Sequence, residues 1–288
     1  MRFKLKKTFI LLLCAVFLMG SATPIASAAT SNRINFPTSA SNVTIYSGKT
    51  RVLEGQSAIV DGVTYVGLRA FCDLFGDYKI SWNDKTKTAS VSADGLSITA
   101  TRGDLYINAN GRCLYTVTAV KIIDDRICVP IRPIAKALGV SVEWDASTRS
   151  VTLKKGSRDF LWADSYYNSD DLYWLSRIIS AEAKGESLKG QIAVGNVVLN
   201  RVRSASYPNT IYGVIFDRKN GTQFSPVALG TIYQKPTASS IIAAKICLEG
   251  YSISNEILFF MNPRIATNNW ISKNRPFAFT IGNHSFYT

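Results

Sequence analysis

The sequence predicts an α+β protein in which a duplicated small α+β domain precedes a mainly helical domain with a small β-sheet. Three observations lead to this fold class. Residues 43–154 contain one strand–helix–strand–strand pattern twice. Residues 170–288 change to long segments with apolar residues at helical spacing. Near the C-terminus, two short apolar segments flank a Gly-Asn pair that is typical of a hairpin turn.

Residues 1–28 are predicted to be a signal peptide. Four cations within the first seven residues precede an apolar core from Phe9 to Met19, and Ala26-Ser27-Ala28 fits a cleavage site. The core is shorter than the about 20 residues that a membrane-spanning helix needs. We therefore expect a secreted chain with no stable membrane anchor after cleavage. An uncleaved anchor is the alternative.

Charge suggests which partners the exported chain meets. The formal net charge is +13, and it falls to +9 without the four cations of the signal peptide. Outside the cell the abundant anions are wall polymers, which a basic surface attracts. An ordinary solvated basic surface would have the same charge. No arginine-rich tract or aromatic-basic stripe indicates nucleic-acid binding.

Cysteine and histidine content limits the chemistry. The mature chain has Cys72, Cys113, Cys128 and Cys247, which allow three complete disulfide pairings that sequence cannot distinguish. A chain of this length does not need disulfides, so we favour buried free thiols. The single histidine, His284, argues against a catalytic zinc site, which usually takes two or three His ligands. We expect no metal and no cofactor.

The duplication aligns Ile59–Arg69 with Ile122–Arg132. In each copy an alternating strand leads to a short helix, predicted over 70–75 and 133–138. Gly76 and Gly139 are expected to end these helices in the left-handed conformation.

After each helix, a strand through Trp82 or Trp144, a polar turn and a last alternating strand complete the unit. Each aligned segment ends in an arginine, Arg69 or Arg132. We expect this arginine either to bind a polymer or to have a local structural role. We favour the structural role.

This region resembles the copper amine oxidase N-terminal-like, or stalk, domain. The resemblance lies in the paired Val-x-(Leu/Ile)-Arg, Leu-x-Gly or Leu-Gly, and Trp-(Asn/Asp) signatures within 43–154. It implies an accessory or wall-associating module of an exported enzyme. One histidine could not supply the oxidase's copper ligands. Residues 155–169 are expected to be a linker.

The second domain opens with a helix that ends in a carboxylate. Ser169 and two aspartates predict its start. Glu182 lies seven residues after Leu175 and four after Ile178, so it projects from the apolar face. Burial and the helix dipole should together raise its pKa, as a general acid requires. Alternatively, Glu182 turns outward and pairs with Lys184 or Arg177.

Further elements follow in order. Ser187 is expected to cap a second, buried helix that Asn196 and Asn200 interrupt. These asparagines either brace the neighbouring helix or face a cleft; we favour bracing for Asn196, and both roles stay open for Asn200. The remaining segments are a strand or loop, a third helix, a buried strand and a hairpin, predicted at 223–227, 238–249, 257–261, and 277–281 with 284–287.

Residues 170–288 resemble the cell wall hydrolase family typified by the spore cortex-lytic enzyme. The resemblance implies a lysozyme-like catalytic core that acts on peptidoglycan glycan strands, and it maps the family's catalytic glutamate onto Glu182. Cortex and vegetative wall both remain open as substrates. The matching segments are 181–186, 190–191, 197–202, 207–210, 223–225, 259–263 and 281–287.

Glycosidases that retain or invert usually need two carboxylates. Candidates for a second one are Glu186, Asp217, Glu249 and Glu256, and none has an apolar setting comparable to that of Glu182. A lone acid suits a lytic transglycosylase, which forms 1,6-anhydro-muramic ends. A non-catalytic wall-binding protein and an N-acetylmuramoyl-L-alanine amidase are the alternatives.

Other substrate contacts are predicted from residue type alone. Polar sugar contacts are expected from Gln223, Ser225 and Asn262, and stacking surfaces from Phe260 or Tyr287. His284 is expected to be either an exposed loop residue or a substrate contact.

Overall fold

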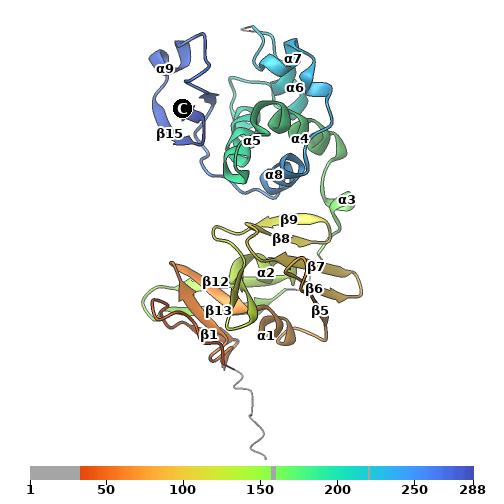
Figure 1. Ribbon diagram of the computed structural model, residues 1–288, viewed down its shortest axis with the longest axis vertical. Helices are drawn as coiled ribbons and strands as arrows, with labels where there is room; N and C mark the ends of the chain where they lie inside the picture. Colours follow the sequence, from red (N-terminus) through yellow and green to blue (C-terminus); the bar gives the residue numbers. More distant parts are fainter. Residues whose placement is uncertain (1–32, 157–159, 220) are drawn as a thin grey trace, which may run out of the picture. The chain divides into compact units, whose positions relative to one another are not determined.

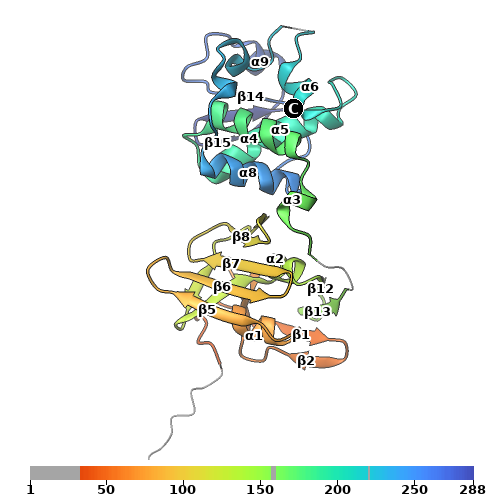
Figure 2. The ribbon, with the colours of Figure 1, turned by 90° about the vertical axis from the view of Figure 1, so that its right-hand side faces the viewer.

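The computed structural model describes residues 33–156, 160–219 and 221–288. It confirms the α+β class: an N-terminal domain of β-sheets with two short helices precedes a helical domain with a three-stranded sheet (Figures 1 and 2). The predicted signal peptide, 1–28, lies outside the described residues.

A local two-fold axis relates the two copies in the N-terminal domain. Hairpins from each copy form one sheet in the order β10-β11-β4-β3. Within it β4 and β11 are antiparallel, and Val66 lies opposite Val129, its equivalent in the duplication. Because equivalent residues face each other, the copies exchange places by a half-turn. The strands are β3 (Ser57–Val60), β4 (Val63–Gly67), β10 (Lys121–Ile123) and β11 (Arg126–Pro130).

Each copy has its predicted helix, which begins two residues earlier than expected. Gly139 follows the second helix with a φ of 66°, as predicted for a left-handed cap. The same prediction for Gly76 is wrong, because its helix ends earlier and the amide of Phe75 bonds instead to the carbonyl of Cys72 at 2.9 Å. The helices are α1 (Leu68–Asp73) and α2 (Ile131–Ala137).

The tryptophan-bearing hairpins, β5–β6 and β12–β13, confirm the rest of the repeat. Each extends into a different sheet: β7 adds antiparallel to β6, whereas β1 adds parallel to β13. The first sheet contains β5 (Lys79–Asn83), β6 (Thr88–Ala93), β7 (Leu96–Thr101), β8 (Tyr106–Ala109) and β9 (Arg112–Tyr115). The second contains β12 (Val140–Asp145), β13 (Ser150–Lys155), β1 (Thr44–Ser47) and β2 (Thr50–Val52).

One apolar core lies under both copies and includes Phe71 and its equivalent Ile134, both fully buried. All four cysteines of the described chain are buried free thiols, as favoured from the sequence. Burial raises the pKa of the Cys72 and Cys128 thiols to about 12, so both stay protonated and unreactive.

In the C-terminal domain, α4, α5 and α8 pack against one another (Figures 1 and 2). The side chain that caps α4 is Asn168, one residue before the expected Ser169; it accepts the amides of Asp170 and Asp171. A short helix within the predicted linker, α3 (Ala163–Tyr166), precedes this domain. The helices of the domain are α4 (Ser169–Ala183), α5 (Leu188–Arg203), α6 (Ile211–Phe216), α7 (Ser225–Ala228), α8 (Ala238–Leu248) and α9 (Trp270–Asn274).

Two buried asparagines hold the chain after α8 against α5. Asn196 accepts the amide of Ile253 at 2.8 Å and donates to the carbonyl of Tyr251 at 3.1 Å. Asn200 donates to two further carbonyls of the same segment, at 3.0 and 2.9 Å. Bracing is thereby confirmed for Asn196, and Asn200 has the same role.

Segment 223–227 differs from its prediction as a strand or loop, because Ser225 begins α7. Pro226 lies in the first turn of that helix, where its fixed φ suits the helix and its missing N–H costs nothing. None of the described helices combines the length and apolarity needed to cross a bilayer.

The predicted C-terminal hairpin is confirmed. It joins the shortened buried strand in the sheet order β14-β16-β15. Asn283 lies in the turn of this hairpin. Glu186, just before α5, accepts hydrogen bonds from the backbone amide and the side-chain nitrogen of Asn283, at 3.2 and 2.9 Å. The hairpin is therefore held against α5. The strands are β14 (Phe259–Met261), β15 (Phe277–Ile281) and β16 (His284–Tyr287).

Candidate active site

Glu182 lies in the last turn of α4 with most of its side chain buried. Burial raises the pKa of its carboxyl to about 7, and the positive charge of Arg201 opposes that rise. The direction expected from its position on the apolar face is confirmed. The alternative ion pairs are not formed within the described structure: Lys184 is exposed, and the Arg177 guanidinium lies 3.6 Å from the ring centre of Tyr173.

Arg201 of α5 is the charged neighbour of Glu182, and it is itself only 5% exposed. Its Nε donates to the carbonyl of Leu258 at 2.8 Å, and its Nη1 donates to Oε1 of Gln223 at 3.4 Å. Burial lowers its pKa, while the nearby Tyr207, Asp217 and Glu182 raise it. The arginine thus links the candidate acid to a predicted sugar contact.

Aromatic rings surround this guanidinium. The ring centres of Tyr207, Phe224 and Phe259 lie 5.0, 5.2 and 5.5 Å from its central carbon. Rings at these distances favour the cation and compensate part of its lost hydration. The rings thus favour the charged form of Arg201 beside Glu182.

The sequence reasoning gave Arg201 no role, although a signal is present. Arg201 follows Val194, Val197 and Val198 by seven, four and three residues, so it lies on the buried stripe of α5. A cation on such a stripe needs a buried partner. The same argument that singled out Glu182 on α4 applies to Arg201.

The predicted polar contacts have different positions. Gln223 lies against Arg201 and also donates to the carbonyl of Gly221 at 3.3 Å. Ser225 is exposed at the start of α7. The side chain of Asn262 accepts the amide of Arg264 at 3.0 Å and so closes the turn after β14. Their contact with sugar stays a prediction.

The predicted stacking surfaces are largely packed inside the protein. Tyr287 is only 6% exposed in β16, the middle strand of its sheet, and its role as a stacking surface stays a prediction. The ring of Phe260 lies 5.3 Å from that of His284 and 6.1 Å from that of Phe286. Phe260 is partly buried and packs against the core, and its role as a stacking surface stays a prediction.

His284 is not an exposed loop residue. It begins β16 and is 7% exposed, because its strand lies between two others. Burial lowers the pKa of its imidazole, and the negative charge of Glu186 opposes this shift. Its Nδ1 is buried without a hydrogen-bond partner in the described part of the chain. A role in substrate contact stays a prediction.

Two of the four candidate second carboxylates have structural partners. Glu186 holds Asn283, and Glu249 pairs with Arg112 and Lys136 at 2.7 and 2.8 Å. Glu256 is exposed. The charge of Asp217 raises the pKa of Arg201, and one carboxylate oxygen of Asp217 accepts a hydrogen bond from the amide of Lys219 at 2.9 Å. Over the described residues, no group of three or more acidic, His or Cys side chains forms a metal site.

The fold and the site define a class of two-domain protein. A duplicated sheet domain comes first, and a helical domain with one largely buried carboxyl of near-neutral pKa follows. Two family models match the chain in that order. Residues 45–159 match the copper amine oxidase N-terminal domain, and residues 185–287 match the cell wall hydrolase domain. The second match begins three residues after Glu182, so it does not include the candidate acid.

Curated relatives match the C-terminal part. The spore cortex-lytic enzyme of Bacillus cereus is 38% identical over 120 residues, which cover 42% of this chain and 45% of the relative. That of Bacillus subtilis is 37% identical over 120 residues, covering 42% and 38%. The cell wall hydrolase CwlJ of Oceanobacillus iheyensis is 30% identical over 111 residues, covering 36% and 77%. The chain belongs to the cell wall hydrolase family.

The matched part spans less than half the length of the spore cortex-lytic enzymes. Among solved structures, the catalytic domain of the germination-specific lytic transglycosylase SleB from Bacillus anthracis is 38% identical. It covers 42% of this chain and 97% of that chain, with a TM-score of 0.39.

Proposed function

We propose that this protein is an exported enzyme that cleaves peptidoglycan glycan strands between N-acetylmuramic acid and N-acetylglucosamine, as a lytic transglycosylase. The observation that carries the proposal is the buried carboxyl of Glu182 with its pKa of about 7. Relatives named as spore cortex-lytic enzymes, and a similar domain described as a lytic transglycosylase, support the substrate and the reaction.

Glu182 would act first as acid and then as base. Its proton passes to the glycosidic oxygen as the bond from that oxygen to the anomeric carbon breaks. The carboxylate then takes the proton of the muramic acid 6-hydroxyl, whose oxygen attacks the same anomeric carbon. The product has a 1,6-anhydro end, the enzyme regains its proton, and no water is consumed.

Arg201 would balance the two forms of Glu182. Burial alone favours the neutral acid, which suits the first step but makes the carboxylate of the second step costly. The arginine's charge stabilises that carboxylate and opposes the rise in pKa. A pKa near the working pH makes proton donation and proton removal comparably easy.

The distribution of carboxylates favours transglycosylation over hydrolysis. A hydrolase of this kind needs a second carboxylate to activate water or form a covalent intermediate. Glu186 and Glu249 already have structural partners, and Glu256 is exposed. Asp217 lies close enough to influence Arg201, so it is the residue to test if hydrolysis is observed.

We also propose the organisation expected from the sequence: a signal peptide over 1–28, a stalk domain over 43–154, a linker over 155–169 and a catalytic domain over 170–288. Export places the enzyme at the cell wall or spore cortex, and relatives named for the cortex make sporulation or germination the setting to examine. The basic surface would also attract anionic wall polymers.

Digestion of purified sacculi, followed by mass spectrometry of the soluble muropeptides, tests the proposal. Anhydro-muramic ends are expected, and Glu182→Gln should release at least ~100-fold less material. Reducing ends would indicate a hydrolase instead, and free stem peptides an amidase. Equal release by Glu182→Gln would leave a wall-binding role and overturn the assignment of the acid.

A further inference from the structure

Two cavities lined mainly by the N-terminal domain occupy equivalent places in the duplication, and the larger one is also bordered by Glu249, Gly250 and Tyr251 of the C-terminal domain. Their volumes are about 710 and 570 Å³. In each, the start of the copy's own helix and its tryptophan-bearing strand form one wall, and the other copy's hairpin forms part of another. The equivalent lining pairs include Leu68 and Ile131, Arg69 and Arg132, Ile80 and Val142, and Trp82 and Trp144.

Both cavities contain an accessible indole beside an arginine. Trp144 is 41% exposed and Trp82 is 44% exposed. Burying a large aromatic side chain stabilises a protein, so both rings leave apolar surface in water that folding could have covered. Each tryptophan lines the same cavity as the arginine of its own copy, Arg132 or Arg69. Exposed aromatic rings lining a concave site, next to fixed polar groups, are features of ligand sites.

Charge distinguishes the two cavities. The larger one, at Trp144, contains Lys136 where the smaller one contains Asp73. Its facing hairpin contributes the uncharged Gly62 and Val63, whereas Asp125 and an arginine occupy those places in the smaller cavity. The acid that borders the larger cavity is Glu249, which is already paired with two cations. The larger cavity therefore favours an anion more than its equivalent does.

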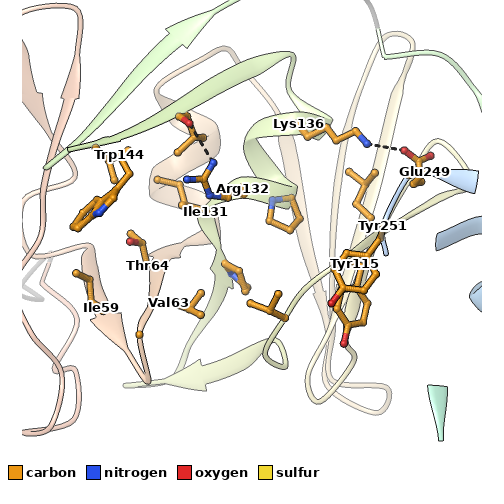
Figure 3. A pocket seen from close by; sticks show the side chains of 18 residues that line it. Ile59, Val63, Thr64, Tyr115, Ile131, Arg132, Lys136, Trp144, Glu249 and Tyr251 are labelled. Carbon is orange, nitrogen blue, oxygen red and sulfur yellow. Dashed lines mark hydrogen bonds and ion pairs between the residues drawn. The ribbon is translucent and has the colours of Figure 1, made fainter. Parts of the chain in front are cut away.

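The larger cavity presents these groups in order (Figure 3). Trp144 lies at one end, Arg132 in the middle, and the Lys136–Glu249 pair at the other end. Apolar Ile59 and Val63 lie on the facing side. Arg132 donates to the carbonyl of Val142 at 3.3 Å, which fixes a guanidinium that has five donors in all.

We propose that the cavity at Trp144 binds a peptidoglycan strand: a sugar ring lies on the indole, and Arg132 pairs with a carboxylate that the strand carries on its lactyl group or stem peptide. A pyranose ring has an apolar face that matches the indole and the apolar residues opposite. Arginine recognises a carboxylate through two parallel hydrogen bonds. Because a sugar ring can stack on the indole, the cavity favours a glycan over a phosphate polymer that has no ring to stack.

This site is separate from the cleavage chemistry. It shares its polymer with the proposed function, but neither Glu182 nor Arg201 lines it. Binding here would hold the enzyme on the wall between cuts. It would remain if the C-terminal domain cut a different bond.

The test uses the full chain with Glu182→Gln, so that the ligand stays intact. Its affinity for soluble muropeptides is measured by calorimetry, and its binding to sacculi stripped of phosphate polymers by sedimentation. Trp144→Ala and Arg132→Met should each weaken binding at least tenfold. Trp82→Ala is the matched control in the equivalent cavity and should change binding less than twofold.

Three results would overturn the proposal. They are unchanged affinity of Trp144→Ala with unaltered thermal unfolding, equal losses from Trp82→Ala and Trp144→Ala, and binding to sacculi only before the phosphate polymers are removed. Carboxyl-free chitin oligomers that bind as tightly as muropeptides would remove the role of Arg132. Failure of the proposed cleavage is seen separately, as normal sacculus binding by a chain that releases no muropeptides.

Discussion

At the residue scale, Glu182 and Arg201 shift each other's pKa in opposite directions. Arg201 lowers the pKa of Glu182, and Glu182 raises the pKa of Arg201. Glu182 is largely buried and Arg201 almost completely so, and burial disfavours the charged form of both. Their mutual attraction opposes this effect. The balance leaves the carboxyl with a pKa of about 7, where it exchanges a proton readily.

The first prediction concerns the pH profile. Because the first step needs protonated Glu182, kcat/KM should fall about tenfold per pH unit above pH ~7. Arg201→Met removes the charge that lowers this pKa, so the falling limb should move to higher pH. Arg201→Lys, which keeps the charge, is the control. A limb that stays in place in Arg201→Met would exclude the electrostatic role.

The second prediction concerns stability. The folded pKa of Glu182, about 7, exceeds the usual 4.5, so its contribution to stability is fully present below pH ~4.5 and is lost as pH rises through 7. At pH 8 the ionised carboxyl costs about 3 kcal/mol. Glu182→Gln does not ionise, so its Tm relative to the parent should rise between pH 5 and 8. A constant difference in Tm would contradict the raised pKa.

At the element scale, the turn between β15 and β16 is fitted to one glutamate. Gly282 has a φ of 58°, and a Cβ there would overlap Oε2 of Glu186. Only glycine both adopts this conformation easily and leaves room for the carboxylate. The turn thereby connects the C-terminal sheet to the start of α5.

The third prediction compares two glycines. Gly282→Ala should destabilise the protein by more than the about 1–2 kcal/mol expected from backbone strain, because it also displaces Glu186. Gly95→Ala is the matched control: its φ is 73°, and a Cβ there meets no atom within 4 Å. Adding Glu186→Ala to Gly282→Ala should recover part of the loss in urea unfolding. Equal costs for the two glycines would show that the contact contributes nothing.

At the scale of the whole molecule, a buried ion pair joins residues of the two domains. Arg112 of β9 binds Glu249 through two bonds, at 2.7 and 2.9 Å, and both side chains are nearly inaccessible. Its guanidinium also lies 4.0 Å from the ring centre of Phe160 and 3.3 Å from that of Tyr166. Burial by itself raises the pKa of Glu249, but hydrogen bonds from Arg112 and Lys136 lower it overall.

The fourth prediction follows from this pair. Arg112→Met should destabilise the protein by about 3–5 kcal/mol, because Glu249 loses its main partner while buried. Calorimetry should show a lower Tm or a split transition. The double variant Arg112→Met, Glu249→Met removes both charges and should recover most of the loss. A Tm of Arg112→Met equal to that of the parent would mean that the pair does not couple the domains.

Sequence by itself determined the features that depend on local pattern. The duplicated strands, the cap at Ser187 and the C-terminal hairpin each follow from periodicity or turn chemistry within a few residues. Glu182 was found in the same way, from its place on an apolar helical face. The residue motifs also indicated the cell wall hydrolase family, which the comparisons confirm.

Only the tertiary structure decided which distant residues meet. It placed Arg201 beside Glu182, Glu186 under a turn 97 residues away, and Tyr287 in the middle of a sheet. It also paired the two copies through β4 and β11, which creates the equivalent cavities. The physical reason is that burial and charge partners depend on long-range packing, whereas helical and strand periodicity are properties of the local chain.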